Sequence, residues 1–185
     1  NATNIRAEYL KHIAKIFELT GENTEKSRSN AALILKLETD LAKNSRKLED
    51  MRDPIKNYNK MTLAQLNALT SNINWNTMFT NLKIKDADTI IVGQPEFYKG
   101  LNASLKNYSV EDWKIYLKWD LFNSYAGNLN TAIEKQNFYF YATVMNGIKA
   151  QKPRWKNIVS QTDGALGELI GQVYIEEYLP KGSKE

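Results

Sequence analysis

Apolar side chains recur every three or four residues along most of this chain, which is the spacing of one face of an α-helix. The first run carries the apolar residues Ile5, Tyr9, Ile13, Ile16 and Phe17, and Gly21 is placed to end it. Further runs of this kind cover residues 22–48, 63–69, 71–82, 95–105, 109–126, 129–144 and 153–178. The periodicity therefore predicts an all-α protein, mainly a bundle-like helical lobe.

One short stretch departs from the helical pattern. Residues 89–92, Thr-Ile-Ile-Val, are β-branched throughout and lie between Asp88 and Gly93, which is typical of a strand. A single strand needs a partner, and no second stretch of this composition is evident. We expect at most this one strand-like segment, paired with a segment outside these 185 residues.

The sharpest interruption of the helical pattern lies within residues 52–63. Pro54 has no backbone N–H and disfavours helical backbone in the residue before it, so the preceding helix is expected to stop by Arg52. The crossing that follows is polar, with Asn57, Asn59 and Lys60. Thr62 can then cap a helix over residues 63–69. By themselves, these residues indicate an ordered connection between helices.

Local signals also place the later helices. Pro95 suits the first turn of a helix, and Ser109 with Asp112 three residues later forms a variant capping box. The helix after Ser109 carries aromatic residues around much of its circumference, so we expect it to be central and mostly buried. Trp75 is assigned to core packing, with the lining of a ligand cleft as the alternative.

Three glycines lie about a turn apart along one side of the last predicted helix: Gly164, Gly167 and Gly171. Each costs about 1 kcal/mol relative to alanine in a helix interior, so a compensating reason is expected. Close approach of another backbone, from this chain or from a missing lobe, would supply one. A hinge is the alternative.

The composition is ordinary for a globular protein, with 42% hydrophobic and 25% charged residues, and 185 residues suffice for one or at most two domains. Net charge is +4, and the lysines are scattered rather than gathered into the basic stripe of a nucleic-acid interface. No apolar run approaches the length of a membrane span. We therefore expect neither nucleic acid nor membrane contact for this segment.

Few residues here suit catalysis or metal binding. There is no cysteine, and His12 is the only histidine, whereas a zinc site needs three or four ligands. The chain has no phosphate-binding glycine loop and no G-x-S-x-G sequence. Adjacent acids would diverge on helices: Glu49-Asp50, Glu111-Asp112 and Glu176-Glu177. No catalytic residue and no metal ligand is predicted in these residues.

The two ends are interpreted separately from the rest. Asn1-Ala2 is interpreted as the remnant of a cleaved expression tag, and residues 181–185 as a polar tail. Residues 3–180 are predicted to form the helical lobe.

Several sequences in order along the chain resemble the non-catalytic lobe of the neprilysin and oligopeptidase O type of zinc metallopeptidase, the M13 family. The resemblance runs from about Ile5 to Pro180. Its motifs are Arg-Asp-Pro with Tyr-Asn-Lys-Met-Thr-Leu in residues 52–63, residues 90–97, residues 111–119, residues 153–156 and residues 163–174. The His-Glu-x-x-His motif of the family is absent from these residues.

The resemblance implies that this chain is part of a larger enzyme. In the family, a catalytic lobe holds zinc and hydrolyses short peptides, and a helical cap lobe encloses the cavity and restricts substrate size. This segment would be the cap, inactive alone, without a cofactor of its own, and partnered by the catalytic lobe of the same polypeptide and by short peptides. The full-length protein would belong to the bacterial cell envelope, periplasmic or secreted.

The residues that match the family's motifs are assigned to structure or to contact between lobes rather than to chemistry. They are Arg52, Asp53, Pro54, Tyr58, Asn59, Lys60, Arg154 and Trp155. Arg52 and Asp53 are expected to fix the break between helices, with Arg154 and Trp155 stacking or pairing against it. The glycines at 164, 167 and 171 form a possible close-packing or interlobe face.

A different class of function also fits the residues. In this alternative, the chain is a stand-alone helical module that binds a peptide or a partner protein without catalysis. Whether the native polypeptide continues into a zinc-binding segment separates the two hypotheses.

Overall fold

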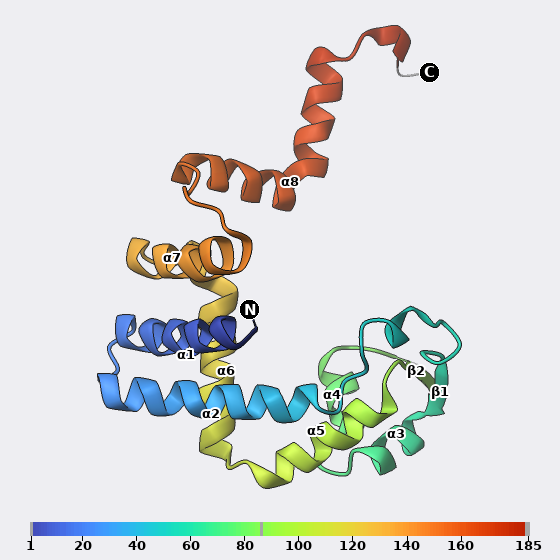
Figure 1. Cartoon of the computed structure of the whole chain (residues 1–185). Coiled ribbons are helices and arrows are strands. Elements are labelled where there is room, and N and C mark those ends of the chain that lie inside the picture. The colour runs from blue at the N-terminus through green and yellow to red at the C-terminus, as the bar shows by residue number, and fades with distance from the viewer. Residues whose placement is uncertain (1, 86, 184–185) are drawn as a thin grey trace. The chain divides into compact units, whose positions relative to one another are not determined.

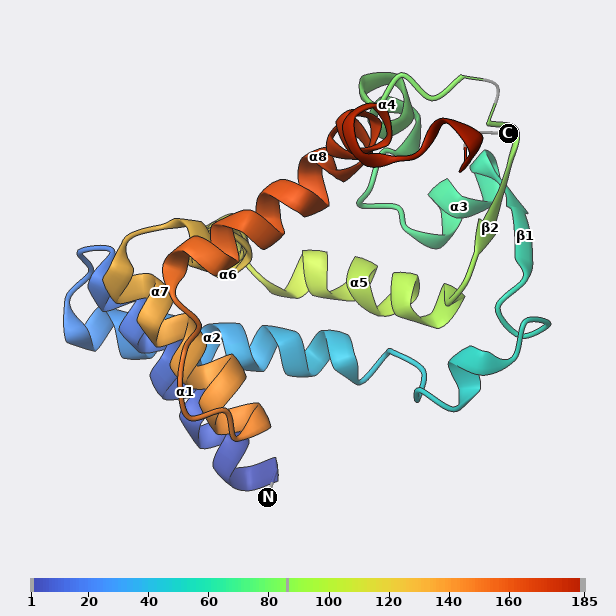
Figure 2. The ribbon, with the colours of Figure 1, turned by 90° about the horizontal axis from the view of Figure 1, so that it is seen from above.

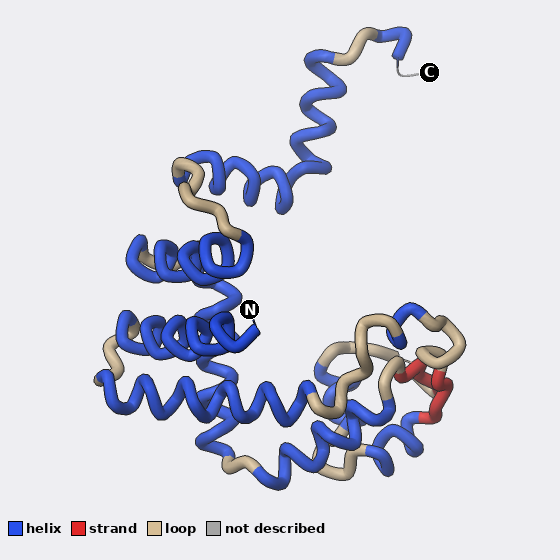
Figure 3. Tube along the Cα trace, in the orientation of Figure 1, coloured by secondary structure: helices blue, strands red, loops and turns tan. Residues whose placement is uncertain are grey.

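The computed structural model describes residues 2–85 and 87–183, and these are mostly helical, with one small sheet (Figure 3). The all-α prediction is therefore confirmed. The residues group into two compact units, Asn1–Met145 and Asn146–Glu185, which are described separately.

The first unit is built around a pair of long helices, α1 (Ala2–Leu19) and α2 (Thr24–Ala42), that lie side by side (Figure 1). Gly21 joins them with a positive φ of 97°, a conformation that a residue with a side chain rarely adopts. The helix α6 (Val110–Tyr125) crosses this pair, and α7 (Thr131–Phe138) packs on α1. A π-helical stretch, Tyr139–Val144, continues α7.

The core of this unit lies where these helices meet. Its buried residues are Ile13, Ala14, Ile16, Phe17, Ala31, Ile34, Trp119, Ala126 and Ile133. The prediction that α6 is mostly buried is wrong: Trp119 is its buried residue, whereas Leu117, Leu121 and Tyr125 are exposed. The reason is that α6 meets its neighbours along one side only, so its aromatic residues do not all find a core.

The second predicted helix ends earlier than its apolar spacing suggested. α2 stops at Ala42, and Leu48, which was assigned to its apolar face, is 70% exposed. The Asn44 side chain donates a hydrogen bond to the Asp40 carbonyl at 2.9 Å, which satisfies a carbonyl of the last turn. A separate 3₁₀ turn, Asp50–Arg52, precedes Asp53, so helical backbone does stop by Arg52 as expected.

The expectation of a lone strand with an outside partner is wrong. β2 (Thr89–Val92) pairs antiparallel with β1 (Asn59–Thr62), with Asn59 opposite Val92 and Thr62 opposite Thr89. The pairing joins segments about thirty residues apart, and the Asn-Lys-Met-Thr sequence of β1 carries little intrinsic preference for a strand. Tertiary context therefore makes this strand.

Three further helices belong to this part of the unit: α3 (Leu63–Leu69), which contacts β1, α4 (Trp75–Asn81) and α5 (Pro95–Asn107), both of which contact α3. Thr62 caps α3 in a capping box with Gln65, and Ser109 caps α6 in one with Asp112, so both predicted caps are confirmed. Pro95 begins α5 as expected. α5 lies beside α2, as Figure 2 shows from above.

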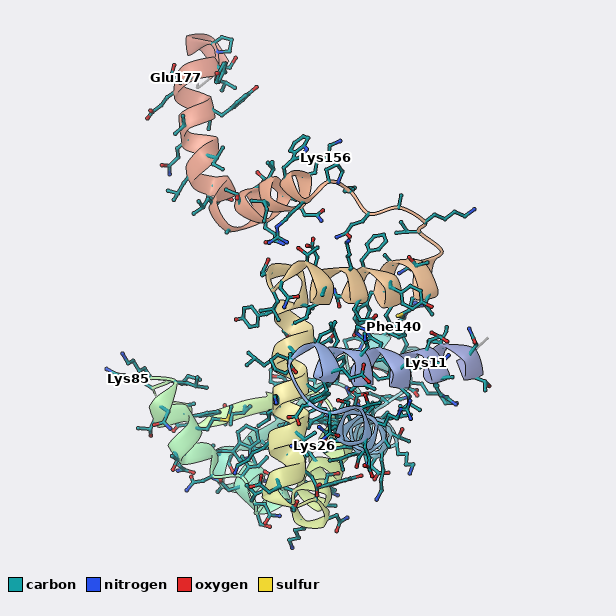
Figure 4. The ribbon with its side chains drawn as sticks, turned by 90° about the vertical axis from the view of Figure 1, so that its left-hand side faces the viewer. Lys11, Lys26, Lys85, Phe140, Lys156 and Glu177 are labelled. Atoms are coloured by element: carbon teal, nitrogen blue, oxygen red, sulfur yellow. The ribbon has the colours of Figure 1, made fainter. Side chains whose placement is uncertain are left out.

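The second unit consists mainly of α8 (Arg154–Tyr178), which matches the predicted last helix, and a 3₁₀ turn, Lys181–Ser183. α8 has no buried residue, and side chains project all around it between Lys156 and Glu177 (Figure 4). Its ribbon changes direction part of the way along (Figure 1). None of the helices in residues 2–85 and 87–183 combines the length and apolarity needed to cross a bilayer.

Candidate functional site

The Asp-Pro break is a loop held by its own polar side chains. Asp53 is extended, with φ −82° and ψ 106°, and its Oδ1 accepts hydrogen bonds from the backbone N–H groups of Ile55 at 2.9 Å and Lys56 at 3.1 Å. This arrangement is an Asx turn, which short aspartate and asparagine side chains form in preference to helix. Asn57 closes the loop by donating to the carbonyls of Met51 and Asp53, at 2.8 and 2.7 Å.

Arg46 ties this loop to the start of α5. One guanidinium nitrogen donates to the Lys56 carbonyl at 2.8 Å and to Asn57 Oδ1 at 3.0 Å. The others bind both carboxylate oxygens of Glu96, and the Arg46 backbone N–H donates to Gln94 Oε1 at 2.8 Å. Hydrogen bonding from Arg46 holds the pKa of the Glu96 carboxyl below its ordinary value. A forked guanidinium suits such two-sided recognition.

Asn59 links the loop to the sheet. Its side-chain nitrogen donates to the Lys56 carbonyl at 2.8 Å and to the Val92 carbonyl of β2 at 3.0 Å. The loop, the sheet and α5 therefore meet in one polar junction, which we call the Arg46 junction: Arg46, Asp53, Asn57, Asn59, Gln94 and Glu96.

The predicted site residues of the first unit divide into two groups. The structure brings Asp53 and Asn59 into the Arg46 junction, and Pro54 lies in the same loop. The side chains of Arg52 and Lys60 are exposed, and Tyr58 is 61% exposed. The residues that anchor the junction, Arg46 and Glu96, were missed by sequence reasoning because fifty residues separate them in the chain.

The other predicted site residues belong to the second unit. Arg154 and Trp155 begin α8, where Trp155 is 63% exposed and the Lys156 ammonium lies 5.4 Å from its ring centre. The proposed contact of Arg154 and Trp155 with the Asp-Pro loop stays a prediction. A Cβ atom added at Gly164 or Gly171 would meet no atom within 4 Å, and one at Gly167 would meet only Asp163, at 3.7 Å.

His12 lies in the core of the first unit, 1% exposed. Its ring stacks on Phe140 of the π-helical stretch at 4.8 Å and 10°, and meets the edge of Trp119 at 5.5 Å. Its Nδ1 lies 3.2 Å from the Gln136 amide nitrogen, while Nε2 has no hydrogen-bond partner among residues 2–85 and 87–183. Burial lowers the pKa of His12 to about 4, so the ring is neutral at pH 7.

A second polar pair lies close to this histidine. The Tyr9 hydroxyl donates to Glu38 Oε1 at 2.9 Å, and the Tyr9 ring packs against both Trp119 and Phe140. Burial raises the pKa of the Glu38 carboxyl and of the Tyr9 hydroxyl. The surroundings of His12 therefore consist of aromatic rings and the hydrogen-bonded pair of Tyr9 and Glu38.

These surroundings do not fit a metal ion. Within the described part of the chain, no three His, Cys, Asp or Glu side chains converge as ligands would. His12 faces aromatic rings rather than carboxylates, and the sequence has no second histidine. The described residues thus form a helical scaffold with a polar junction.

Comparison with known proteins places the chain among peptidases. The sequence model of Peptidase family M13 matches residues 1–185, and the chain belongs to this family. The resemblance seen in the sequence motifs is thereby confirmed.

Among similar proteins, an endothelin-converting enzyme homolog from Locusta migratoria is 29% identical over 97% of the chain and 26% of its own length. Endothelin-converting enzyme 1 from Mus musculus is 28% identical over 95% of the chain and 24% of its own length. The zinc metalloprotease Zmp1 of Mycobacterium tuberculosis, in an open state, superimposes with a TM-score of 0.90 at 29% identity, over 98% of this chain and 28% of that one. The chain thus spans about a quarter of the length of these relatives.

Proposed function

We propose that this chain is part of the helical lobe that caps the active-site cavity of a zinc metallopeptidase acting on short peptides. The observation that carries the proposal is the match to Peptidase family M13 over all 185 residues, within relatives about four times as long. The helical scaffold, whose described residues contain no cluster of three side chains that could hold a metal ion, is consistent with a capping role.

In this proposal, zinc and the catalytic groups belong to residues outside this chain, and the 185 residues alone are inactive. The Arg46 junction then serves to hold the shape of the lobe. It fixes the direction in which the chain leaves α2 and joins it to α5, because it ties three segments together by side-chain hydrogen bonds. We assign Arg52, Tyr58 and Lys60, whose side chains are exposed, to contact with the rest of the enzyme.

The catalytic lobe of the same polypeptide and short peptides are the proposed partners, and the bacterial cell envelope or the exterior is the proposed location. Cell fractionation with detection of the native protein tests the location. Recovery of the protein from the cytoplasm would contradict it.

The deciding experiment measures the intact mass and zinc content of the native polypeptide and its hydrolysis of short peptides. We expect a mass several times the 21.2 kDa of this chain, one zinc per polypeptide and hydrolysis that a chelator abolishes. The 185-residue chain serves as control and should neither bind zinc tightly nor cleave peptides. A native polypeptide of about 21.2 kDa without zinc would refute the proposal and favour the stand-alone binding module.

A further inference from the structure

The helix α8 carries an apolar stripe, interrupted at Thr162, that nothing in its own unit covers. The stripe, called here the α8 stripe, consists of Ile158, Val159, Leu166, Leu169, Ile170 and Val173, which are 42–59% exposed. With 3.6 residues per turn, these six side chains fall within about a third of the helix circumference. From Ile158 to Val173 no charged residue falls within this third of the circumference, although Thr162 does and Asp163 lies about 20° beyond its edge.

A helix of this kind is not expected to persist unaided. α8 spans 25 residues, contains three glycines and has no buried residue. In proteins, most helical stability comes from packing of an apolar face rather than from the intrinsic preference of the residues. An exposed apolar face of this length on a helix therefore marks a site of contact with another segment.

The chemistry of the stripe restricts what can cover it. Because the stripe is aliphatic and uncharged, its occupant must present an apolar face of similar length, and charge attraction cannot select it. The relatives are about four times as long as this chain, so they contain much further sequence that could supply such a face. A segment of the same polypeptide also has a high effective concentration, which a separate protein lacks.

We infer that the α8 stripe is covered, in the complete polypeptide, by an apolar segment of the same chain that lies outside these 185 residues. The inference rests on the proposed function, because it requires a longer polypeptide. The hydrophobic core to which α8 belongs is then completed by residues outside this chain.

Amide hydrogen exchange of peptides from α8 tests this inference in the complete polypeptide and in the 185-residue chain. We expect exchange in α8 to be at least about 100-fold slower in the complete polypeptide, since covered helices open far more rarely than uncovered ones. Leu166→Lys should raise the α8 exchange rate at least about tenfold in the complete polypeptide.

Gln161→Lys is the matched control, because it adds the same charge at an exposed position about 140° around the helix from Leu166. It should leave α8 exchange unchanged. If Leu166→Lys prevents folding, Leu166→Ala provides the milder perturbation, and it should also speed exchange in α8 specifically.

Three outcomes would overturn the inference. Equal α8 exchange in the two proteins is the first, and equal effects of the Leu166 and Gln161 variants is the second. The third is a 185-residue chain that sediments as a dimer dissociated by Leu166→Lys, which would make a second copy the occupant. The first outcome, if the complete polypeptide contains zinc and is active, would refute the inference and leave the proposed function intact. A long polypeptide in which α8 is protected from exchange but which contains no zinc would support the inference and refute the proposed function.

Discussion

Acid should destabilise the first unit through His12, and the size of the loss in folding stability follows from the burial of its ring. The ordinary pKa of histidine is 6.5 and that of His12 in the fold is about 4. Between these values the unfolded chain binds a proton that the folded chain does not. Stability is therefore fully present above about pH 6.5 and declines as the pH falls towards 4. The loss is about 2 kcal/mol at pH 5 and reaches about 3 kcal/mol below pH 4.

The assay is urea unfolding at pH 7 and pH 5 at constant ionic strength, followed by near-ultraviolet circular dichroism of the aromatic cluster. His12→Gln is the control, because glutamine is polar but does not ionise. The native protein should lose about 2 kcal/mol more than the variant over this interval. Protonation of Glu38, whose pKa is raised by burial, opposes the loss equally in both proteins. An identical loss in the native protein and the variant would refute the reasoning.

Three further predictions concern melting temperature in the 185-residue chain, followed by circular dichroism. Gly100→Ala should lower the stability by about 1–3 kcal/mol, because a Cβ there would overlap the Asn44 side chain. Gly171→Ala is its control, because a Cβ added there would meet no atom within 4 Å, and it should instead stabilise the helix by up to about 1 kcal/mol. Equal changes in melting temperature for the two variants would contradict the packing argument. Asp53→Ala removes the acceptor of two backbone hydrogen bonds and should cost about 1–2 kcal/mol, so an unchanged melting temperature would count against it. Arg46→Lys should lower the melting temperature by a few degrees, since an ammonium cannot reproduce the fork that joins Glu96 to the loop, and full retention would disprove that role.

Features set by neighbouring residues could be predicted from the sequence. Thr62 and Ser109 cap helices through side chains three residues away, and Pro95 begins a helix through its own ring, so each signal lies within one turn. The early end of α2 was missed because Leu48 continues the apolar spacing after the helix has stopped. Spacing records where apolar residues recur, and it does not record where the backbone leaves the helix.

Features set by distant residues could not be predicted in this way. β1 exists because residues 59–62 pair with residues 89–92, and the Arg46 junction joins residues fifty apart. In neither case does the sequence around one segment indicate which distant segment it will contact. The Asp-Pro break could therefore be singled out from the sequence, while the side chains of Arg46 and Glu96 that hold it became visible only in the fold.

The pairing of β1 with β2 also bears on how the length of this part of the chain can vary. The two strands bring the ends of residues 63–88 together, so α3 and α4 form an excursion that leaves and re-enters the molecule at one place. The cost of closing such a loop grows only slowly with its length. Insertions or deletions within it would therefore leave the register of the sheet and the course of α5 intact. Leu66 and Thr70 are buried, and Asn72 contacts Asn102, so these parts of the segment should be kept. The exposed remainder is where variants of different length should be tolerated and where a tag or a second domain could be inserted.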